Sequence, residues 1–596
     1  MKKDCGRKKK FAYNVNYVVT LDRIANKENG IEIIKKLINH TGMKNQIEEW
    51  DNLGLIGTEF NMKRIIQESL DGQILNNDYK FLAVDTKYFK EIENDILSSF
   101  ENLDDDLDGW LLHSENFQAL NTIAFRFKEK IRTIYIDPPY NTGNDGFIYR
   151  DSFKHSSWLS MMDNRVGLAK YIANPEGVIF VSIGDLDPQE GESYRLQLLL
   201  STIFNKRFGN LIWKKRGGIG SFSEKYLTEN HEYIAVYGNE KSFLFDNIIS
   251  EQKKKQYTEK DEKGPYRWMD LIGPSQQTKE KRPNLNYGIL CDVKSAKMIG
   301  FEYYEKGEKK VEFFDNEYTS DLYTIRLEGK YTWLISKQYM KKYYREGLVR
   351  VFEKNGSFGV KIKNYLYNDN GSINGNILKS LLSDNGVEIG MNQEATKELA
   401  KLFSDLDTYT INPKPVSLIK LLIYASCPEN GIVLDFFSGS GTTAHAVMKL
   451  NKEDGGKRKF ILIEMADYLQ TIILPRLKKI AYSFEWKDGK PLDNEGIGLF
   501  LKYYDLEQYE DSLNNIKVRE QQNYDKFKPY LVEYILKYGT SDSAFFINKE
   551  MLSDPFNVKM KIVNGGIEKE ATMDLIETFN LWYGVNVEKV VSIDII

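Results

Sequence analysis

Apolar residues form short continuous runs in the middle of the chain, from about residue 107 onward. The predicted strands are 132–137 (Arg-Thr-Ile-Tyr-Ile-Asp), 177–183 and 231–237, and residues 158–173 are the predicted crossover helix. Near-continuous apolar strands are typical of parallel sheets that are covered on both faces. Strands that alternate with helices predict a doubly wound α/β fold.

The same pattern returns nearer the C-terminus. Residues 417–424 predict a helix, 431–435 a strand, Thr442 the start of a helix, and 459–464 the next strand. The segment between the two α/β parts, about 249–410, is rich in Lys, Tyr and Gly and shows short alternating strands instead. It is therefore predicted to be an insert in the α/β sheet.

The two ends of the chain are predicted to be accessory regions. Residues 11–21 alternate like a strand, and 29–40 carry apolar residues at helical spacing. The acidic run 101–108 is predicted to be a solvated linker at a domain boundary. The predicted segments are 1–106 (N-terminal accessory region), 107–248 and 411–482 (the two halves of the sheet), 249–410 (insert) and 483–596 (C-terminal accessory domain).

Composition excludes several classes of protein. The 596 residues carry a net charge of −4, with 41% hydrophobic and 28% charged residues, which is typical of a globular protein and not of a wholly basic DNA binder. Residues 251–370 nevertheless hold 24 Lys and Arg against 18 Asp and Glu, so the basic surplus lies in the insert. Three scattered cysteines favour neither a disulfide framework nor a zinc site, which suits the cytoplasm. No apolar run is long enough to cross a membrane.

A carboxylate followed by two prolines and an aromatic residue stands at the end of the first central strand. In this motif, Asp137-Pro138-Pro139-Tyr140, the prolines remove two N–H donors and stiffen the loop. What remains is a carboxylate, carbonyl acceptors and an aromatic face, which suit a planar base bearing an amino group. A Pro-rich turn with a capping Asp is the alternative.

A glycine-rich turn follows the later strand that ends at Asp435. Gly439 and Gly441 let the backbone approach a ligand closely, and Glu464 ends the next strand, where a carboxylate suits a ribose diol. A nicotinamide dehydrogenase is a rival, although only Ala444 fits the third position of its glycine fingerprint. A phosphate-binding P-loop is excluded because no Lys-Ser or Lys-Thr follows the glycines. A purely structural strand–helix turn is the remaining alternative.

Together the two motifs resemble the amino-group DNA methyltransferases of the beta class. In that class the Asp-Pro-Pro-Tyr motif precedes the Phe-x-Gly-x-Gly motif, which here is 437–441, and a target recognition domain lies between them. Segments 110–120, 230–237 and 412–417 also resemble this class, and 264–288 and 503–511 resemble type III modification subunits and their larger relatives. The resemblance implies a circularly permuted Rossmann-like methyltransferase sheet with an inserted target recognition domain.

The resemblance also implies the reaction and the residues that carry it. A methyl group would pass from S-adenosylmethionine to the N6 amine of an adenine flipped out of double-stranded DNA. The implied catalytic residues are Asp137, Pro138, Pro139 and Tyr140. The implied cofactor-binding residues are Glu115 (where the family usually has Asp), Asn116, Asp435, Phe436, Phe437, Ser438, Gly439, Gly441, Thr442 and Glu464. The candidate DNA contacts are Lys281, Arg282, Lys341, Lys342 and Arg345.

Other interpretations remain beside this one. A cytosine-N4 methyltransferase would share the fold, although Asp137 favours adenine because cytosine enzymes of the group more often carry Ser there. A catalytically inactive DNA-binding module is the non-enzyme alternative. Trp158 and Asp163 are interpreted as core and cap, and the histidines show no metal-ligand pairing, so no metal is expected. A restriction (helicase-nuclease) subunit and a second copy of the chain are the candidate protein partners, and no membrane is expected.

Overall fold

The computed structural model divides the chain into two compact units. Unit 1 comprises Met1–Phe245 and Ile377–Ile596, and unit 2 comprises Asp246–Asn376. The structure describes residues 10–591 except 71, 142–153, 185–191, 218–229, 246–247, 274–277, 316, 320, 330, 370–372, 405–410, 509–510, 512–553, 555–556 and 565–566. The five-segment division stays a prediction.

Unit 1 is built on one large mixed sheet. Its strand order is β23-β24-β1-β22-β5-β19-β18-β6-β7-β9-β8, and β4 pairs with β1 at the side. The central strands are β5 (Gly109–His113), β6 (Ile131–Ile136), β7 (Ala173–Ile183), β8 (Lys206–Lys214), β9 (His231–Gly238), β18 (Ile432–Asp435), β19 (Lys459–Glu464) and β22 (Phe500–Leu506). From β22 to β7 the neighbours are parallel, whereas β9 and β8 are antiparallel. The predicted doubly wound α/β class is confirmed.

The strand order brings together segments that are far apart in the sequence. β18 pairs with β6 in parallel, with Leu434 opposite Ile134, so both strands end at nearly the same level. From β18 the chain passes through α13 (Thr442–Asp454) to β19 on one side, and from β6 it passes through α7 (His155–Ile172) to β7 on the other. Such a reversal of direction is the switch point beside which open α/β sheets bind ligands.

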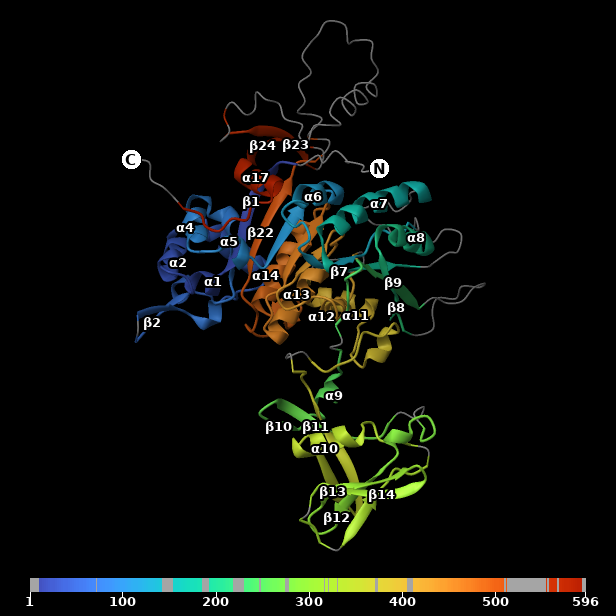
Figure 1. Ribbon diagram of the computed structural model, residues 1–596. Helices are drawn as coiled ribbons and strands as arrows, with labels where there is room; N and C mark the ends of the chain where they lie inside the picture. The colour runs from blue at the N-terminus through green and yellow to red at the C-terminus, as the bar shows by residue number, and fades with distance from the viewer. Residues whose placement is uncertain are drawn as a thin grey trace. The chain divides into compact units, whose positions relative to one another are not determined.

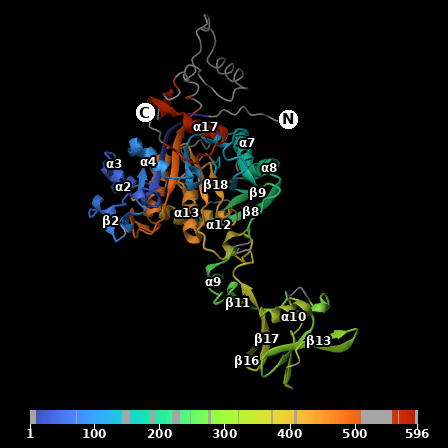
Figure 2. The ribbon, with the colours of Figure 1, turned by 60° about the vertical axis from the view of Figure 1, so that its left-hand side comes forward.

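Two groups of helices cover the sheet. One group contains α12 (Val416–Tyr424), α13 and α14 (Leu474–Tyr482), and the other contains α6 (Asn116–Ile123), α7, α8 (Ser193–Ile203) and α17 (Leu575–Tyr583). Figures 1 and 2 show these two groups on either side of the strands. Residues 392–402 form a further helix, α11 (Asn392–Leu402). The predicted helices at 158–173, 417–424 and from Thr442 are confirmed.

Both ends of unit 1 contribute strands to the central sheet. β1 (Ala12–Thr20) is antiparallel to β22 and pairs with β4 (Ala83–Asp85) and β24 (Ile567–Asp574), which pairs with β23 (Lys559–Asn564). The predicted strand at 11–21 and helix at 29–40 are confirmed. The N-terminal helices are α1 (Leu21–Ala25), α2 (Gly30–Asn39), α3 (Met43–Asn52), α4 (Glu93–Ser98) and α5 (Leu103–Asp106), beside a hairpin of β2 (Ile66–Ser69) and β3 (Gly72–Leu75).

The acidic run at 101–108 is not a solvated linker, so that prediction was wrong. Asp104 is buried and its carboxylate lies 2.6 Å from the buried Arg126 guanidinium, while Asp108 pairs with Arg23 at 3.2 Å. Burial of a charge is tolerated when a partner of opposite charge is buried with it. The run therefore ties α5 to the core of unit 1, through partners that lie outside the local sequence.

Unit 2 contains two small antiparallel sheets. One has the order β10 (Glu259–Asp261), β11 (Gly264–Asp270), β17 (Ser357–Tyr365) and β16 (Val349–Lys354), and the other β14 (Glu308–Phe313), β13 (Lys297–Glu305), β12 (Gly288–Asp292) and β15 (Leu322–Ile325). They are drawn in green to yellow in Figure 1, with helices α9 (Glu251–Lys254) and α10 (Lys337–Arg345). A core that includes Phe301, Trp333 and Met340 joins the elements of this unit.

Three further predictions concern membrane helices, the cysteines and two residues of α7. No helix in the described part of the chain is long and apolar enough to cross a membrane. Cys291 and Cys427 are free and buried, and Cys5 lies outside the described residues. Asp163 lies exposed within α7 and does not cap it, whereas Trp158 is buried as predicted.

Candidate active site

The Asp-Pro-Pro-Tyr motif begins where β6 ends. All six residues of β6 are buried, and Asp137 is the first residue beyond it. The prolines cannot donate to a strand ladder, so the chain leaves the sheet here. On α7, the indole N–H of the buried Trp158 donates to the Pro139 carbonyl at 2.9 Å. The motif is therefore fixed against the core while its carboxylate lies at the switch point of the sheet.

Five charged or phenolic side chains lie together at the end of β6. The Tyr140 hydroxyl donates to Asp137 Oδ1 at 2.9 Å, and the Lys414 ammonium donates to Asp137 Oδ2 at 2.8 Å. Lys414 Nζ also lies 3.4 Å from Glu232 Oε2, and Lys215 Nζ lies 3.4 Å from Glu232 Oε1. The result is an alternating chain of charges: carboxylate, ammonium, carboxylate, ammonium.

Burial and charge act in opposite directions on these groups. Burial raises the pKa of Asp137 above its ordinary value, although Lys414 opposes the shift. Burial would also raise the pKa of Glu232, but Lys414 and Lys215 overcome it and hold that pKa below the ordinary value. Burial would lower the pKa of Lys414, but the two carboxylates overcome it and raise that pKa above its usual range. Lys414 is therefore a fixed positive charge beside Asp137.

Lys414 and Glu232 were not among the site residues predicted from the sequence. Lys414 stands between Pro413 and Pro415, just before α12, and Glu232 is the second residue of β9. Both segments had been noted for their family resemblance, but a local pattern does not reveal that they meet Asp137. A buried carboxylate at the start of a strand, opposite a proline-flanked lysine, was the available signal.

The residue after the motif is held by a second carboxylate. Asn141 has a positive φ of 64°, and its amide donates to Glu192 Oε1 at 2.9 Å. His155 Nδ1 lies 2.5 Å from the same oxygen. These contacts hold Asn141 in place next to Tyr140.

The glycine-rich turn lies at the end of β18, beside the first motif. Asp435 accepts hydrogen bonds from the Phe437 backbone N–H at 3.0 Å and the Thr443 hydroxyl at 2.5 Å. Burial raises its pKa to about 7, although those two donors oppose the shift. Gly439 and Gly441 have φ of 50° and 77°, in the left-handed region that favours glycine. Asp435 and the glycines thus shape the turn that starts α13.

Glu464, the last residue of β19, braces this turn. Its Oε2 accepts the Gly439 N–H at 2.8 Å, and its Oε1 accepts the N–H groups of Met465 and Ala466 at 3.0 and 2.9 Å. The side chain is therefore committed to the backbone of the turn. A contact with a ribose stays a prediction.

The start of α6 completes the edge. Glu115 caps the helix by accepting the Gln118 N–H at 3.1 Å, and the Asn116 amide donates to the Phe436 carbonyl at 3.0 Å. Arg165 of α7, which the sequence did not single out, forms hydrogen bonds with both Glu115 and Asn116. The structure thus brings the implied cofactor-binding residues 115–116, 435–442 and 464 to one edge of the sheet.

The candidate DNA contacts all lie in unit 2. Lys281 and Arg282 are exposed before β12, and Lys342 and Arg345 are exposed on α10. Lys341 is half-buried, with its ammonium 3.8 Å from Glu312. Their role stays a prediction. Among the described residues no cluster of His, Cys, Asp and Glu is arranged to hold a metal ion.

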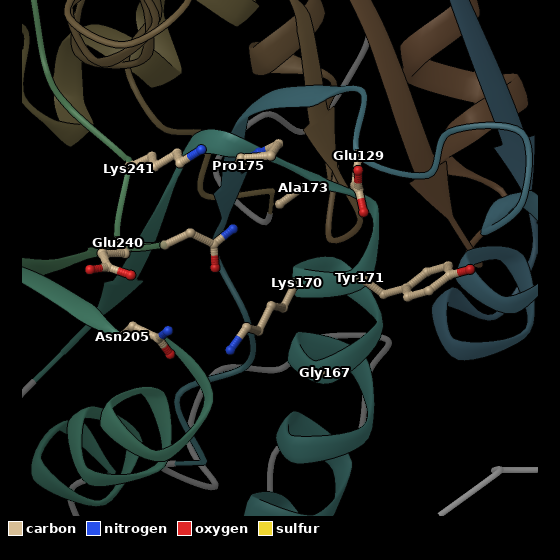
Figure 3. A pocket seen from close by; sticks show the side chains of 10 residues that line it. Glu129, Gly167, Lys170, Tyr171, Ala173, Pro175, Asn205, Glu240 and Lys241 are labelled. Atoms are coloured by element: carbon tan, nitrogen blue, oxygen red, sulfur yellow. The ribbon is translucent and has the colours of Figure 1, made fainter. Parts of the chain in front are cut away.

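A cavity of about 540 Å³, with more apolar than polar surface, lies at the other edge of the sheet. Its wall includes Glu129, just before β6, and Ala173, the first residue of β7, so it adjoins the amino ends of these strands. Figure 3 shows Lys170, Asn205 and Glu240 around it. None of the described residues that line it belongs to either motif, so it is separate from the candidate active site.

Comparison with known proteins identifies the family. Residues 131–474, more than half of the chain, match the model of the N6_N4_Mtase family, described as DNA methylase. The chain belongs to the DNA methylase family. The matched range includes both strand-end motifs of this methylase and the whole of unit 2. The predicted membership of this family is confirmed.

By name, the curated relatives are Mod subunits of type III restriction-modification enzymes and type II methyltransferases. The probable type III restriction-modification enzyme HindVI Mod subunit of Haemophilus influenzae is 28% identical over 73% of this chain and 59% of its own length. The StyLTI Mod subunit of Salmonella typhimurium is 29% identical over 59% of this chain and 51% of its own. The type II methyltransferase M.KpnI of Klebsiella pneumoniae is 30% identical over 59% of this chain and 79% of its own length. The matches to the two Mod subunits thus span between half and three fifths of those proteins.

Proposed function

We propose that this methylase transfers a methyl group from S-adenosylmethionine to the N6 amine of adenine at a specific sequence in double-stranded DNA, as the modification component of a restriction-modification system. The observation that carries the proposal is that β6 and β18, which are distant in the sequence, end side by side with an acceptor motif on one and a glycine-rich turn on the other. The names of the Mod relatives support the system to which it is assigned. A separate restriction subunit is the partner that this proposal entails.

The residues around the turn fit S-adenosylmethionine. A Cβ added at Gly439 would meet no atom within 4 Å, so the space beside this backbone is open to a ligand. Phe437 is partly exposed next to it and offers an apolar face, while Asn116 and Glu464 fix the backbone on either side. When bound, S-adenosylmethionine supplies a methyl group that its sulfonium already activates. Asp435, Phe437, Gly439 and Gly441 would hold it.

The first motif would act on the target amine. The exocyclic nitrogen of adenine is a poor nucleophile because its lone pair is delocalised into the ring. The Asp137 carboxylate and the Pro138 carbonyl would accept its two hydrogens, which favours a tetrahedral nitrogen and the later loss of a proton. Tyr140 would present its ring to the flipped base, since its hydroxyl is fixed on Asp137. Catalysis here is positioning and electrostatics.

The chemistry of the product tests the proposal. The full chain is incubated with S-adenosylmethionine and genomic DNA from a methylation-free host, and the DNA is digested to nucleosides for mass spectrometry. We expect N6-methyldeoxyadenosine. N4-methyldeoxycytidine would instead establish the cytosine alternative, and no methylated nucleoside would support the inactive DNA-binding module.

Glu464→Ala is expected to weaken both the fold and cofactor binding. The substitution removes the carboxylate that the N–H groups of Gly439, Met465 and Ala466 share. Of these residues Ala466 is buried, and a buried unsatisfied donor costs about 1–3 kcal/mol. Unfolding in denaturant and calorimetric titration with S-adenosylmethionine measure the two effects. Glu464→Gln, which keeps one carbonyl oxygen, should have a stability and a cofactor affinity between those of the unaltered chain and those of Glu464→Ala. Unchanged affinity in Glu464→Ala would contradict the bracing role.

Removing the charges of Lys341, Lys342 and Arg345 together is expected to weaken DNA binding and flatten its salt dependence. For every phosphate that no longer has a cationic partner, the slope of log affinity against log salt should fall by about 0.9. Arg345 should carry most of the effect, because the ammonium groups of Lys341 and Lys342 already lie 3.8 and 3.9 Å from Glu312 and Glu346. Affinity for S-adenosylmethionine should not change, because α10 belongs to unit 2. An unchanged slope in a folded variant would make these residues an ordinary solvated helix face.

A further inference from the structure

The lysine between the two carboxylates at the end of β6 has a geometry that the proposed chemistry does not by itself require. The Lys414 side chain is 11% exposed and that of Glu232 is 7% exposed, whereas Asp137 keeps 26%. The ammonium is thus almost withdrawn from solvent, while the carboxylate beside it remains accessible to a substrate. A buried lysine is costly unless carboxylates compensate its charge, and here two of them do so.

We propose that Lys414 is a positioning residue for methyl transfer, which holds the Asp137 carboxylate ionised and aimed at the target amine, and that Glu232 holds Lys414 in place. The inference rests on the proposed function, because it concerns the group that would accept the amine hydrogens. It adds two residues to the reaction that neither strand-end motif contains.

Contacts between two segments, the one before α12 and the motif after β6, support this role. Lys414, in the segment before α12, donates a hydrogen bond to Asp137 Oδ2, and Tyr140, in the motif itself, donates one to Oδ1. The Lys414 ammonium also lies 3.1 Å from the Tyr140 oxygen and 5.3 Å from the centre of its ring. Both oxygens of the carboxylate are therefore oriented before a substrate arrives, and neither can rotate without breaking a charge-assisted contact.

Glu232 is a second carboxylate partner of Lys414, so the ammonium lies between Glu232 and Asp137. Its Oε2 lies 3.4 Å from Lys414 Nζ and 3.2 Å from the Tyr140 hydroxyl oxygen, and its Oε1 faces Lys215. An incoming amine hydrogen on Asp137 weakens the hold of that carboxylate on Lys414. Glu232 can then accept a hydrogen bond from the Lys414 ammonium, so the positive charge of Lys414 stays compensated during turnover.

If Lys414 has this role, two variants should shift the pH dependence of methylation in opposite directions. Asp137 must be ionised to accept a hydrogen, so activity falls as the pH drops through its pKa. Lys414 opposes the upward shift that burial imposes on this pKa, and Glu232 adds to that shift. Removing the lysine charge should therefore raise the pKa, and removing the Glu232 charge should lower it. The groups that face Asp137 are Lys414, Glu232, Tyr140, Tyr135 and Asp435, with Lys215 behind Glu232.

The experiment measures initial methylation rates between pH 5.5 and 9 on genomic DNA from a methylation-free host, at subsaturating DNA. For Lys414→Met we expect a rate reduced by at least tenfold at neutral pH and an acidic limb moved upward by roughly one pH unit or more, the shift that an opposite charge at this distance produces. For Glu232→Gln we expect the acidic limb of the pH–rate profile to move to lower pH. Lys414→Arg keeps the positive charge and should return the limb towards that of the unaltered chain.

Controls separate positioning from a structural role. Lys420→Met on α12 removes a lysine that pairs with Glu453 at 2.7 Å, away from both motifs, and should leave the profile unchanged. Affinity for S-adenosylmethionine should stay within about twofold in all variants, because Lys414 lies on the side of the first motif. Should Lys414→Met fail to fold, Lys414→Gln removes the same charge and tests the upward shift, while Glu232→Gln still tests the downward shift.

The outcomes distinguish this inference from the proposed function. If the unaltered chain makes no methylated nucleoside, the proposed function is wrong. If it methylates DNA but Lys414→Met and Glu232→Gln shift the limb in the same direction, or not at all, Lys414 is only structural and the inference is overturned. Opposite shifts with retained cofactor affinity support it.

Discussion

Asp137→Ala is expected to abolish methyl transfer while leaving the affinity for S-adenosylmethionine within a few fold. The substitution removes the acceptor that the proposed reaction needs at the target amine, and a positioned proton acceptor contributes about 10²–10⁴-fold. Cofactor affinity should persist because the turn on β18 is braced by Asp435 and Glu464, and neither depends on Asp137 for a hydrogen bond. Methylation assays and calorimetric titration on the same preparation measure the two effects.

A matched variant keeps this result interpretable. Asp137→Ala also leaves the buried Lys414 with one carboxylate fewer, which lowers stability. Asp137→Asn retains the shape of the side chain and one carbonyl oxygen, so it should fold more stably and still methylate poorly. Turnover at the rate of the unaltered chain in either variant would contradict the assignment of the motif.

Gly441→Val is expected to remove most of the affinity for S-adenosylmethionine. Gly441 has φ of 77° and ends the turn as the N-cap of α13, and a β-branched residue there is strained. An added Cβ would also lie 3.1 Å from the Ile473 side chain, a tight contact to which either that side chain or the turn would have to yield. Strain of this kind costs about 1–3 kcal/mol, and a displaced turn would no longer match the ligand. Calorimetric titration measures the reduced affinity.

The other end of the same helix offers the control. Gly455 is the C-cap of α13, with φ of 74°, and an added Cβ there would meet no atom within 4 Å. Gly455→Val therefore imposes similar backbone strain at a distance from both motifs. It should lower the free energy of unfolding but leave cofactor affinity unchanged. Equal effects of the two variants on affinity would mean that the turn is only structural.

The parts of the site that depend on local pattern could be predicted from the sequence. Apolar runs ending at Asp137 and Asp435, a pair of prolines after the first and a pair of glycines after the second are all visible within short stretches of the chain. Parallel strands end at one edge of a sheet, so the meeting of the two motifs follows once both strands are placed in it. The strand order then confirmed that they are neighbours.

The charged partners could not be predicted, because they come from distant elements. Lys414 and Glu232 reach Asp137 from a loop and from an antiparallel strand, and neither segment shows by its own pattern which carboxylate the lysine meets. The interpretation of the acidic run at 101–108 failed for the same reason, since its partners Arg126 and Arg23 lie on other elements. The use of Glu464 as a brace likewise depends on backbone N–H groups that a sequence does not display.

The proposed activity is sequence-specific methylation of adenine at N6. The most direct test expresses the full chain in a methylation-free host and sequences the genome with a method that detects modified bases. We expect N6-methyladenine at one recurrent sequence, absent from cells that express Asp137→Ala. A genome without N6-methyladenine, in cells that contain the folded chain, would contradict the account.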